Sequence, residues 1–187
     1  MRPFTVRTFV SARREEVFDF IADLAARPAW TDHYARDFRL ARARASGEGA
    51  AARFAIDPPG PRIWVEVAIT EADRPRRVVE HGGAGRRGRT QLWAVYELTQ
   101  EAPGLTRVEL TIWTDPATRI DALKESLGVR GWLRRRSRTS LERLRMALED
   151  PPEAPLARVG IAGYDEHAAP RFGASPRHGV AAPADRR

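Results

Sequence analysis

The chain contains no cysteine and no asparagine, and Lys124 is its only lysine. The lack of cysteine excludes disulfide bonds, thiolate zinc sites and cysteine nucleophiles. No hydrophobic run approaches the roughly 20 residues needed to cross a bilayer, and no apolar segment of a signal peptide follows Met1. We therefore expect a soluble, cytoplasmic protein.

Arginine supplies almost all of the positive charge, and the net charge of +7 is concentrated in one segment. Residues 130–145 hold seven arginines and one glutamate, whereas the charges of the preceding residues nearly cancel. Abundant arginine without lysine or asparagine is typical of GC-rich codon usage. Because no aromatic residues alternate with the arginines to stack on bases, we do not expect nucleic acid as a partner.

The hydrophobic pattern is alternating in the middle of the chain and becomes helical near residue 118. Alternation and turn residues predict seven strands, at about 4–10, 37–41, 54–56, 63–70, 76–81, 91–98 and 107–113. Two short helices are expected after the first strand, and the second begins at Pro28. A long amphipathic helix should run from about residue 118 to residue 149, with a kink or a break at Gly128 and Gly131.

This order predicts an α+β domain over residues 1–150, followed by a tail over residues 151–187. The tail is rich in Pro, Gly and Ala and is expected to be largely disordered. Four spaced apolar residues interrupt it: Val159, Ile161, Tyr164 and Phe172. They are either isolated residues in a disordered segment or a short segment that docks on this chain or on another copy.

With this order of elements, residues 4–149 resemble the START-like (SRPBCC) superfamily, which includes polyketide cyclases and lipid-transfer domains. The resemblance rests on the first strand, on the segment 11–23, on Pro28, Ala29 and Trp30, and on the final amphipathic helix. It implies a helix-grip fold, in which a curved seven-stranded antiparallel sheet wraps the long C-terminal helix around an apolar cavity. These motifs are structural, so they specify the fold and not a reaction.

The residues that would line such a cavity follow from the alternation of the strands and from the stripe of the final helix. Periodicity alone leaves a solid core and a cavity as alternatives, and the resemblance favours the cavity. The candidates for contact with a ligand are Trp30, Phe54, Ile56, Val65, Val67, Leu92, Ala94, Tyr96, Val108, Leu110, Ile112, Leu123 and Leu127.

Polar groups that point into the cavity would orient a ligand or act on it. Tyr96 has the same parity as Leu92, while His81 and His33 are expected near the rim of the cavity. Tyr96 with one of these histidines is the only acid–base combination that the sequence offers to a cyclase-type reaction. Packing or surface exposure is the alternative explanation for each of them.

Two further features of the sequence do not predict a binding site. The segment from Gly83 to Gly88 matches G-x-G-x-x-G, but the alternating residues after it predict a strand, whereas a nucleotide site needs a helix there. The four histidines show no ligand pair at helical spacing, so we expect neither a metal nor a cofactor.

Three functions remain open at this stage. The first is binding, and possible transport, of a hydrophobic small molecule such as a lipid, a polyketide or an isoprenoid. The second is a cyclase or dehydratase that uses the same cavity, and the third is an interaction module that uses the tail. The basic segment Arg130–Arg145, with Trp132 and Leu133, is either a solvated helix face or a peripheral contact with an anionic membrane. The sequence leaves the oligomeric state open.

Overall fold

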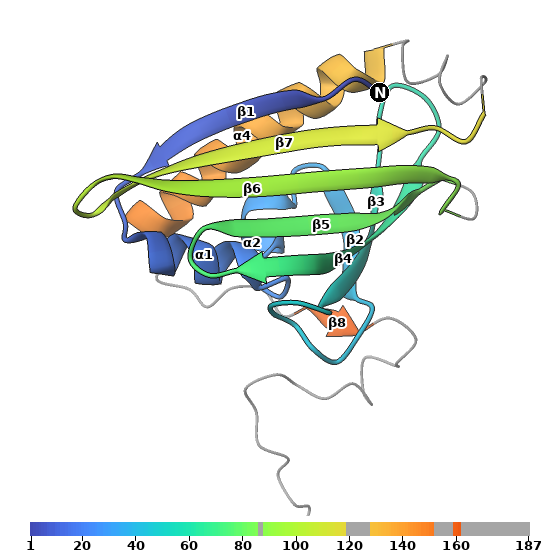
Figure 1. The fold of residues 1–187 in the computed structure, drawn as a ribbon. Helices are drawn as coiled ribbons and strands as arrows, with labels where there is room; N and C mark the ends of the chain where they lie inside the picture. Colours follow the sequence, from blue (N-terminus) through green and yellow to red (C-terminus); the bar gives the residue numbers. More distant parts are fainter. Residues whose placement is uncertain (86–87, 119–127, 152–158, 162–187) are drawn as a thin grey trace, which may run out of the picture.

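A strongly curved sheet forms most of the molecule, and the helices lie on its concave side (Figure 1). The computed structural model describes residues 1–85, 88–118, 128–151 and 159–161. Within these residues the strands are β1 (Phe4–Val10), β2 (Ala35–Leu40), β3 (Ala51–Ile56), β4 (Ile63–Asp73), β5 (Arg77–Ala84), β6 (Thr90–Ala102), β7 (Leu105–Asp115) and β8 (Gly160–Ile161). The helices are α1 (Arg14–Ala22), α2 (Pro28–Thr31) and α4 (Arg130–Glu149).

The strands follow the order β1-β7-β6-β5-β4-β3-β2-β8 across the sheet. The pairs from β1 to β2 are all antiparallel, as short connections between neighbouring strands require. The predicted α+β helix-grip fold is confirmed, and each of the seven predicted strands forms. The predicted strand count is wrong by one, because β8 adds an eighth strand.

Strand β8 pairs in parallel with the edge strand β2, through Arg39 with Gly160 and Leu40 with Ile161. Ile161 is only 5% exposed and belongs to the same hydrophobic core as Leu40. Burial of this one side chain explains why the short strand forms at all. This part of the apolar segment therefore docks on its own chain, while Tyr164 and Phe172 lie outside the described residues.

Helices α1 and α2 cover the concave face at the end where β1 passes into α1. Glu16 accepts hydrogen bonds from the backbone and the side chain of Arg13 and so caps the start of α1. Val17, Phe18 and Ile21 lie on one face of α1 and are buried. This helix therefore fills its end of the sheet with close-packed side chains.

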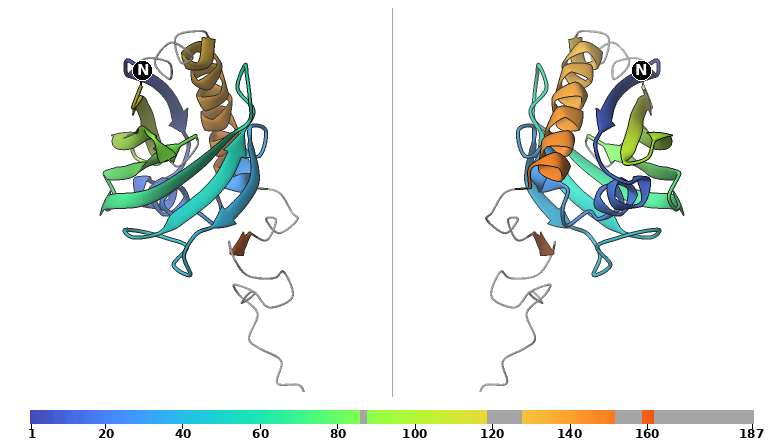
Figure 2. Two further views of the ribbon diagram at one scale, coloured as in Figure 1. Left: turned by 90° about the vertical axis from the view of Figure 1, so that its right-hand side faces the viewer. Right: turned by 90° about the vertical axis from the view of Figure 1, so that its left-hand side faces the viewer.

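Helix α4 crosses the concave face, with the sheet curving around it (Figure 2). It begins at Arg130, after Gly128, whose φ of 102° is incompatible with a continuous α-helix. Its two ends are fixed to the sheet. Arg130 donates hydrogen bonds to the carbonyls of residues 2 and 3, and Glu149 accepts one from the backbone of Ser11 at 2.8 Å.

Among the described residues, no helix combines the length and the apolar composition that crossing a bilayer requires.

The close approach of β4 and β5 depends on Gly82. A Cβ atom at this position would overlap the backbone of Glu66 and would lie 2.8 Å from Cα of Val67. The variant Gly82→Ala should therefore lower the free energy of unfolding by about 1–3 kcal/mol, the usual cost of overpacking. Urea denaturation followed by circular dichroism measures this change.

Gly131→Ala is the matched control for Gly82→Ala. A Cβ at residue 131 meets only the end of the Arg135 side chain, at 3.8 Å, and alanine favours a helix. This control should leave the stability unchanged or raise it. Equal stability of the two variants would show that β4 and β5 do not need the glycine.

Candidate functional site

The concave face holds a cavity of about 450 Å³, bounded by the sheet, by α2 and by the first turns of α4. Ten of the residues predicted from strand alternation and from the second helix line it: Trp30, Phe54, Ile56, Val65, Val67, Leu92, Ala94, Tyr96, Leu110 and Ile112. Val129, at the cap before α4, and Leu133 of α4 also contribute to the apolar lining. That these residues contact a ligand stays a prediction.

Three predicted lining residues have a different outcome. Val108 has inward parity but is 0% exposed, and it belongs to the filled core instead of the cavity. The reason is its position along β7, near the end of the sheet that α1 covers. Leu123 and Leu127 lie outside the described residues. A solid core and a cavity therefore both occur, at opposite ends of one sheet face.

A buried group of polar side chains forms part of the cavity wall. Arg27, from the turn before α2, makes an ion pair with Glu80 of β5, and both residues are at least 94% buried. The second guanidinium nitrogen, Nη1, donates to Oε2 of Glu80 at 3.3 Å and to the hydroxyl of Tyr96 at 3.1 Å. A further bond of 3.2 Å reaches the carbonyl of Ile21, at the end of α1. One guanidinium thus joins both short helices to the sheet.

Aromatic rings enclose this guanidinium on two sides. The Cζ atom of Arg27 lies 4.6 Å from the ring centre of Trp30 and 5.4 Å from that of Tyr96. The two rings meet edge to face, with centres 6.2 Å apart. Such contacts stabilise a desolvated cation through the negative faces of the rings. The rings therefore act together with the ion pair to stabilise the buried guanidinium.

The charges at this position are balanced. Burial is the largest single influence on the pKa of Arg27 and lowers it. The charge and hydrogen bond of Glu80, together with the Tyr96 and Tyr34 hydroxyls, outweigh burial, so the net shift of this pKa is upward and the guanidinium stays charged. Burial raises the pKa of Tyr96 well above its usual value, so the phenol stays protonated. The group as a whole is polar and electrically neutral at physiological pH.

Two N–H groups of this cluster have no hydrogen-bond partner among the described residues. They are Nε1 of Trp30 and Nε of Arg27, and both side chains line the cavity. Buried polar groups almost always have a partner. Each of these nitrogens has almost no accessible surface, so a ligand oxygen would reach it only after a shift of its side chain.

Neither histidine lines this cavity. His81 follows Glu80 on β5 and so has the opposite parity; it lies on the outer face, with its ring stacked on Trp93 at 4.8 Å. His33 lies beside α4, where its Nε2 is 3.2 Å from the carbonyl oxygen of Arg136. Burial is the main cause that lowers the pKa of His33. The expected combination of Tyr96 with a histidine is therefore not assembled.

The sequence-based reasoning missed Arg27 and Glu80. Glu80 carried a signal, because it alternates with Val78 and so points inward from a strand where a carboxylate needs a partner. Arg27 carried none, since it is one of many arginines and lies in a turn. Its partner is 53 positions away in the sequence.

The glycine motif agrees with its interpretation as a structural element. Gly83 lies in β5, and β6 begins at Thr90 and pairs with β5, so a strand and not a helix follows the glycines. In the part of the chain that the structure describes, no three His, Cys, Asp or Glu side chains gather as a metal site would need.

Fold and cavity together define a helix-grip protein of the kind that binds hydrophobic molecules. A family model described as polyketide cyclase/dehydrase and lipid transport matches residues 1–149, and the chain belongs to this family. The predicted resemblance is thereby confirmed. A search of curated proteins gives no match.

Solved structures with the same fold come from distant proteins. A major latex-like protein from Panax ginseng is 9% identical with a TM-score of 0.62, and the alignment covers 79% of this chain and 97% of that one. A START superfamily protein from Mycobacterium smegmatis is 10% identical with a TM-score of 0.58, over 80% and 99% of the two chains. The KanY protein is 17% identical with a TM-score of 0.65, over 79% and 97%. At these identities the likeness shows the fold alone.

The ion pair between Arg27 and Glu80 yields a stability prediction. Removing one partner, as in Glu80→Leu or Arg27→Met, leaves an unpaired buried charge and should lower the free energy of unfolding by about 3–5 kcal/mol. The double variant should recover most of this loss, because two apolar side chains replace both charges. A double variant as unstable as the sum of the two single variants, in urea denaturation, would contradict the coupling.

Proposed function

We propose that the chain binds a hydrophobic small molecule inside the concave cavity, with one neutral polar group of that molecule facing Trp30 and Tyr96. The observation that carries this proposal is the combination of an apolar lining with a single buried, charge-balanced polar cluster. Ligand sites are typically apolar cavities of about 300–1,000 Å³ with a few placed polar groups, and this cavity falls in that range.

The chemistry of the cluster favours a particular kind of ligand group. Because Glu80 already neutralises Arg27, a carboxylate placed beside Trp30 and Tyr96 would find no uncompensated positive charge in this cluster and would be costly to bury there. A ketone, ester or hydroxyl oxygen could accept from Nε1 of Trp30 or from the protonated Tyr96 at lower cost. A lipid, polyketide or isoprenoid with such an oxygen fits this description.

Binding is better supported than a cyclase or dehydratase reaction. Acid–base chemistry needs a group that is free to take up a proton, and Glu80 is held by Arg27. The tail gives little support to an interaction module, since Gly160 and Ile161 pair with their own chain. The assignment of residues 1–150 as the ligand-binding domain, with a separate tail, is likewise part of this proposal.

Filling the cavity tests this function. Ala94 is 7% exposed and lines the cavity from β6, so Ala94→Trp should weaken binding of an apolar fluorescent probe at least tenfold. Native mass spectrometry of the freshly purified chain should show a co-purifying apolar compound that Ala94→Trp loses.

The matched control is Thr99→Trp, which adds the same ring to an exposed position of the same strand. This variant should bind the probe as the unchanged chain does. Equal probe binding by all three proteins would contradict a ligand site inside the sheet.

We also propose that the exposed arginines of α4 make peripheral contact with anionic membranes, as loading of a lipid-like ligand would require. Arg134, Arg135 and Arg138 are exposed, and none of them has an ion-pair partner among the described residues. Trp132 takes no part, contrary to the expectation, because it is 9% exposed and packs edge to face on Tyr34. The contact is therefore electrostatic, without an inserted aromatic ring.

Vesicle sedimentation tests this membrane contact. Vesicles with 30% phosphatidylserine, a composition chosen for this test, should bind the chain at low salt and release it as salt screens the charges. The triple variant Arg134→Gln, Arg135→Gln, Arg138→Gln should lose most of the binding. Binding that survives high salt, or that the triple variant retains, would contradict a purely electrostatic contact.

A further inference from the structure

The outer face of the sheet carries a row of stacked rings on three neighbouring strands. Trp113 of β7, Trp93 of β6 and His81 of β5 are direct cross-strand partners. The two tryptophan rings are nearly parallel, with an angle of 6° and centres 5.6 Å apart, and His81 stacks on Trp93 at 4.8 Å and 25°. This spacing matches the distance of about 4.8 Å between neighbouring strands, so each strand contributes one ring.

The row of rings stops where the strands continue. The next cross-strand partner of His81 is Ala68 of β4, and the one after it is Ala51 of β3. Neither alanine carries a ring that could stack on the imidazole. The sheet therefore has a vacant place, one strand spacing from His81, where a further ring would stack.

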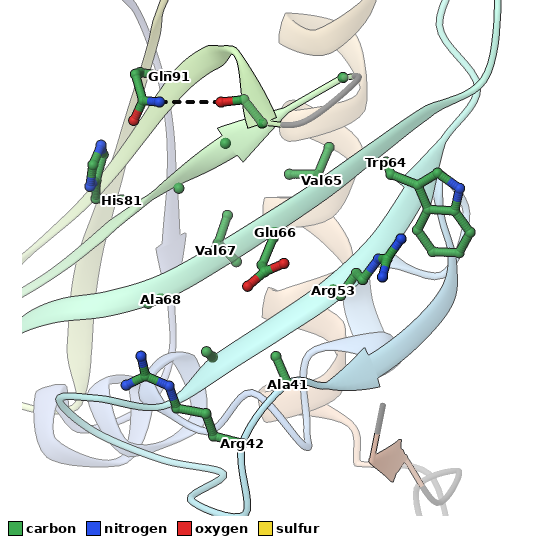
Figure 3. A pocket seen from close by; sticks show the side chains of 15 residues that line it. Ala41, Arg42, Arg53, Trp64, Val65, Glu66, Val67, Ala68, His81 and Gln91 are labelled. Atoms are coloured by element: carbon green, nitrogen blue, oxygen red, sulfur yellow. Dashed lines mark hydrogen bonds between the residues drawn. The ribbon is translucent and has the colours of Figure 1, made fainter. Parts of the chain in front are cut away.

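A groove occupies this place. Its volume is about 570 Å³, and small residues make up much of its lining: Ala41, Ala51, Ala68, Gly82 and Gly83. Figure 3 shows the groove from close by, with Ala41 and Ala68 labelled. It lies on the side of the sheet opposite to the concave cavity, and the two linings share only Val65, Val67 and Gly85 among the described residues. The groove and the cavity are thus separate sites.

A second cross-strand row runs beside the row of rings and contributes polar side chains to the lining of the groove. Gln91, Gly83, Glu66 and Arg53 follow one another on β6, β5, β4 and β3. Glu66 is exposed and has no ion pair among the described residues, and Figure 3 shows it between the two sides of the groove. Its carboxylate can accept hydrogen bonds from N–H groups at the edge of a bound ring.

Positive charge lies on the β3 side of the groove. The guanidinium of Arg53 is held over the ring of Trp64, at 4.6 Å, and that of Arg42 donates to the carbonyl of Gly49 at 3.1 Å. Both arginines lack an acidic partner in the described part of the chain, so an anionic group beside them would be attracted. In addition, Nε2 of His81 is a buried nitrogen without a hydrogen-bond partner among the described residues.

From this arrangement we propose a second ligand site, which binds one planar heteroaromatic ring that carries an anionic substituent. The ring stacks on His81 above Ala68, its N–H edge faces Glu66, and the anionic group lies toward the β3 side, where Arg42 and Arg53 supply positive charge. A nucleoside monophosphate has all three features in one molecule. Guanine suits the carboxylate especially well, because it presents neighbouring N–H donors on one edge.

The test uses the full chain with guanosine monophosphate as the probe, followed by isothermal titration calorimetry. The unchanged chain should bind the probe, and guanosine or inorganic phosphate alone should bind at least tenfold more weakly. Adenosine monophosphate should bind less tightly, because it lacks the paired donors that face Glu66. Failure to bind guanosine monophosphate at millimolar concentration would overturn the proposal.

Two variants locate the binding. His81→Ala removes the stacking surface and should weaken binding roughly tenfold. Ala68→Phe places a ring of the chain's own in the vacant position and should abolish binding. Ala68→Ser, which leaves the place open, is the matched control and should bind as the unchanged chain does.

The readout distinguishes this site from the concave cavity. All three variants should bind an apolar fluorescent probe normally, which also shows that they are folded. Retention of guanosine monophosphate binding by both His81→Ala and Ala68→Phe would place the nucleotide elsewhere and overturn the proposal, whatever the outcome for the cavity.

Discussion

The buried ion pair between Arg27 and Glu80 is the interaction on which the concave side depends. Two charges at least 94% buried are stable only if their geometry is good and their remaining valences are used. The terminal nitrogens of the guanidinium meet both conditions, since they also reach Tyr96 and the end of α1, whereas Nε has no partner among the described residues. Consequently α1, α2 and the strands β5 and β6 meet at one guanidinium, which forms part of the cavity wall.

The same strands serve two faces with opposite chemistry. Inward positions of β4, β5 and β6 supply an apolar cavity wall with one polar cluster, while outward positions supply stacked rings and isolated charges. Both faces depend on small residues. Gly82 allows β4 and β5 to approach each other, and Ala68 leaves the outer groove open. The cavity and the groove therefore depend on small residues at these positions as much as on the larger side chains around them.

Local pattern predicted the strands, the two short helices and most of the cavity lining, because parity along a strand fixes which face a side chain takes. It failed where the surroundings of a side chain depend on its position along the strand or on a partner that is distant in the sequence. Val108 has the right parity but lies under α1, and the partner of Arg27 is 53 positions away. The sequence does not show which face of the sheet carries His81, because the alternation of β5 is too short to establish it. Strand β8 has only two residues, and so short a segment shows no alternation from which its pairing with β2 could be predicted.

Strand β8 also has a consequence for association between copies of the chain. An edge strand offers unpaired backbone groups to which a strand of another molecule can add. At Arg39 and Leu40 of β2 those groups face the chain's own residues 160 and 161. Because this pairing is intramolecular, its effective concentration does not fall on dilution. The chain thereby shields one margin of its sheet from growth by strand addition, using a segment that lies beyond the part matched by the family model.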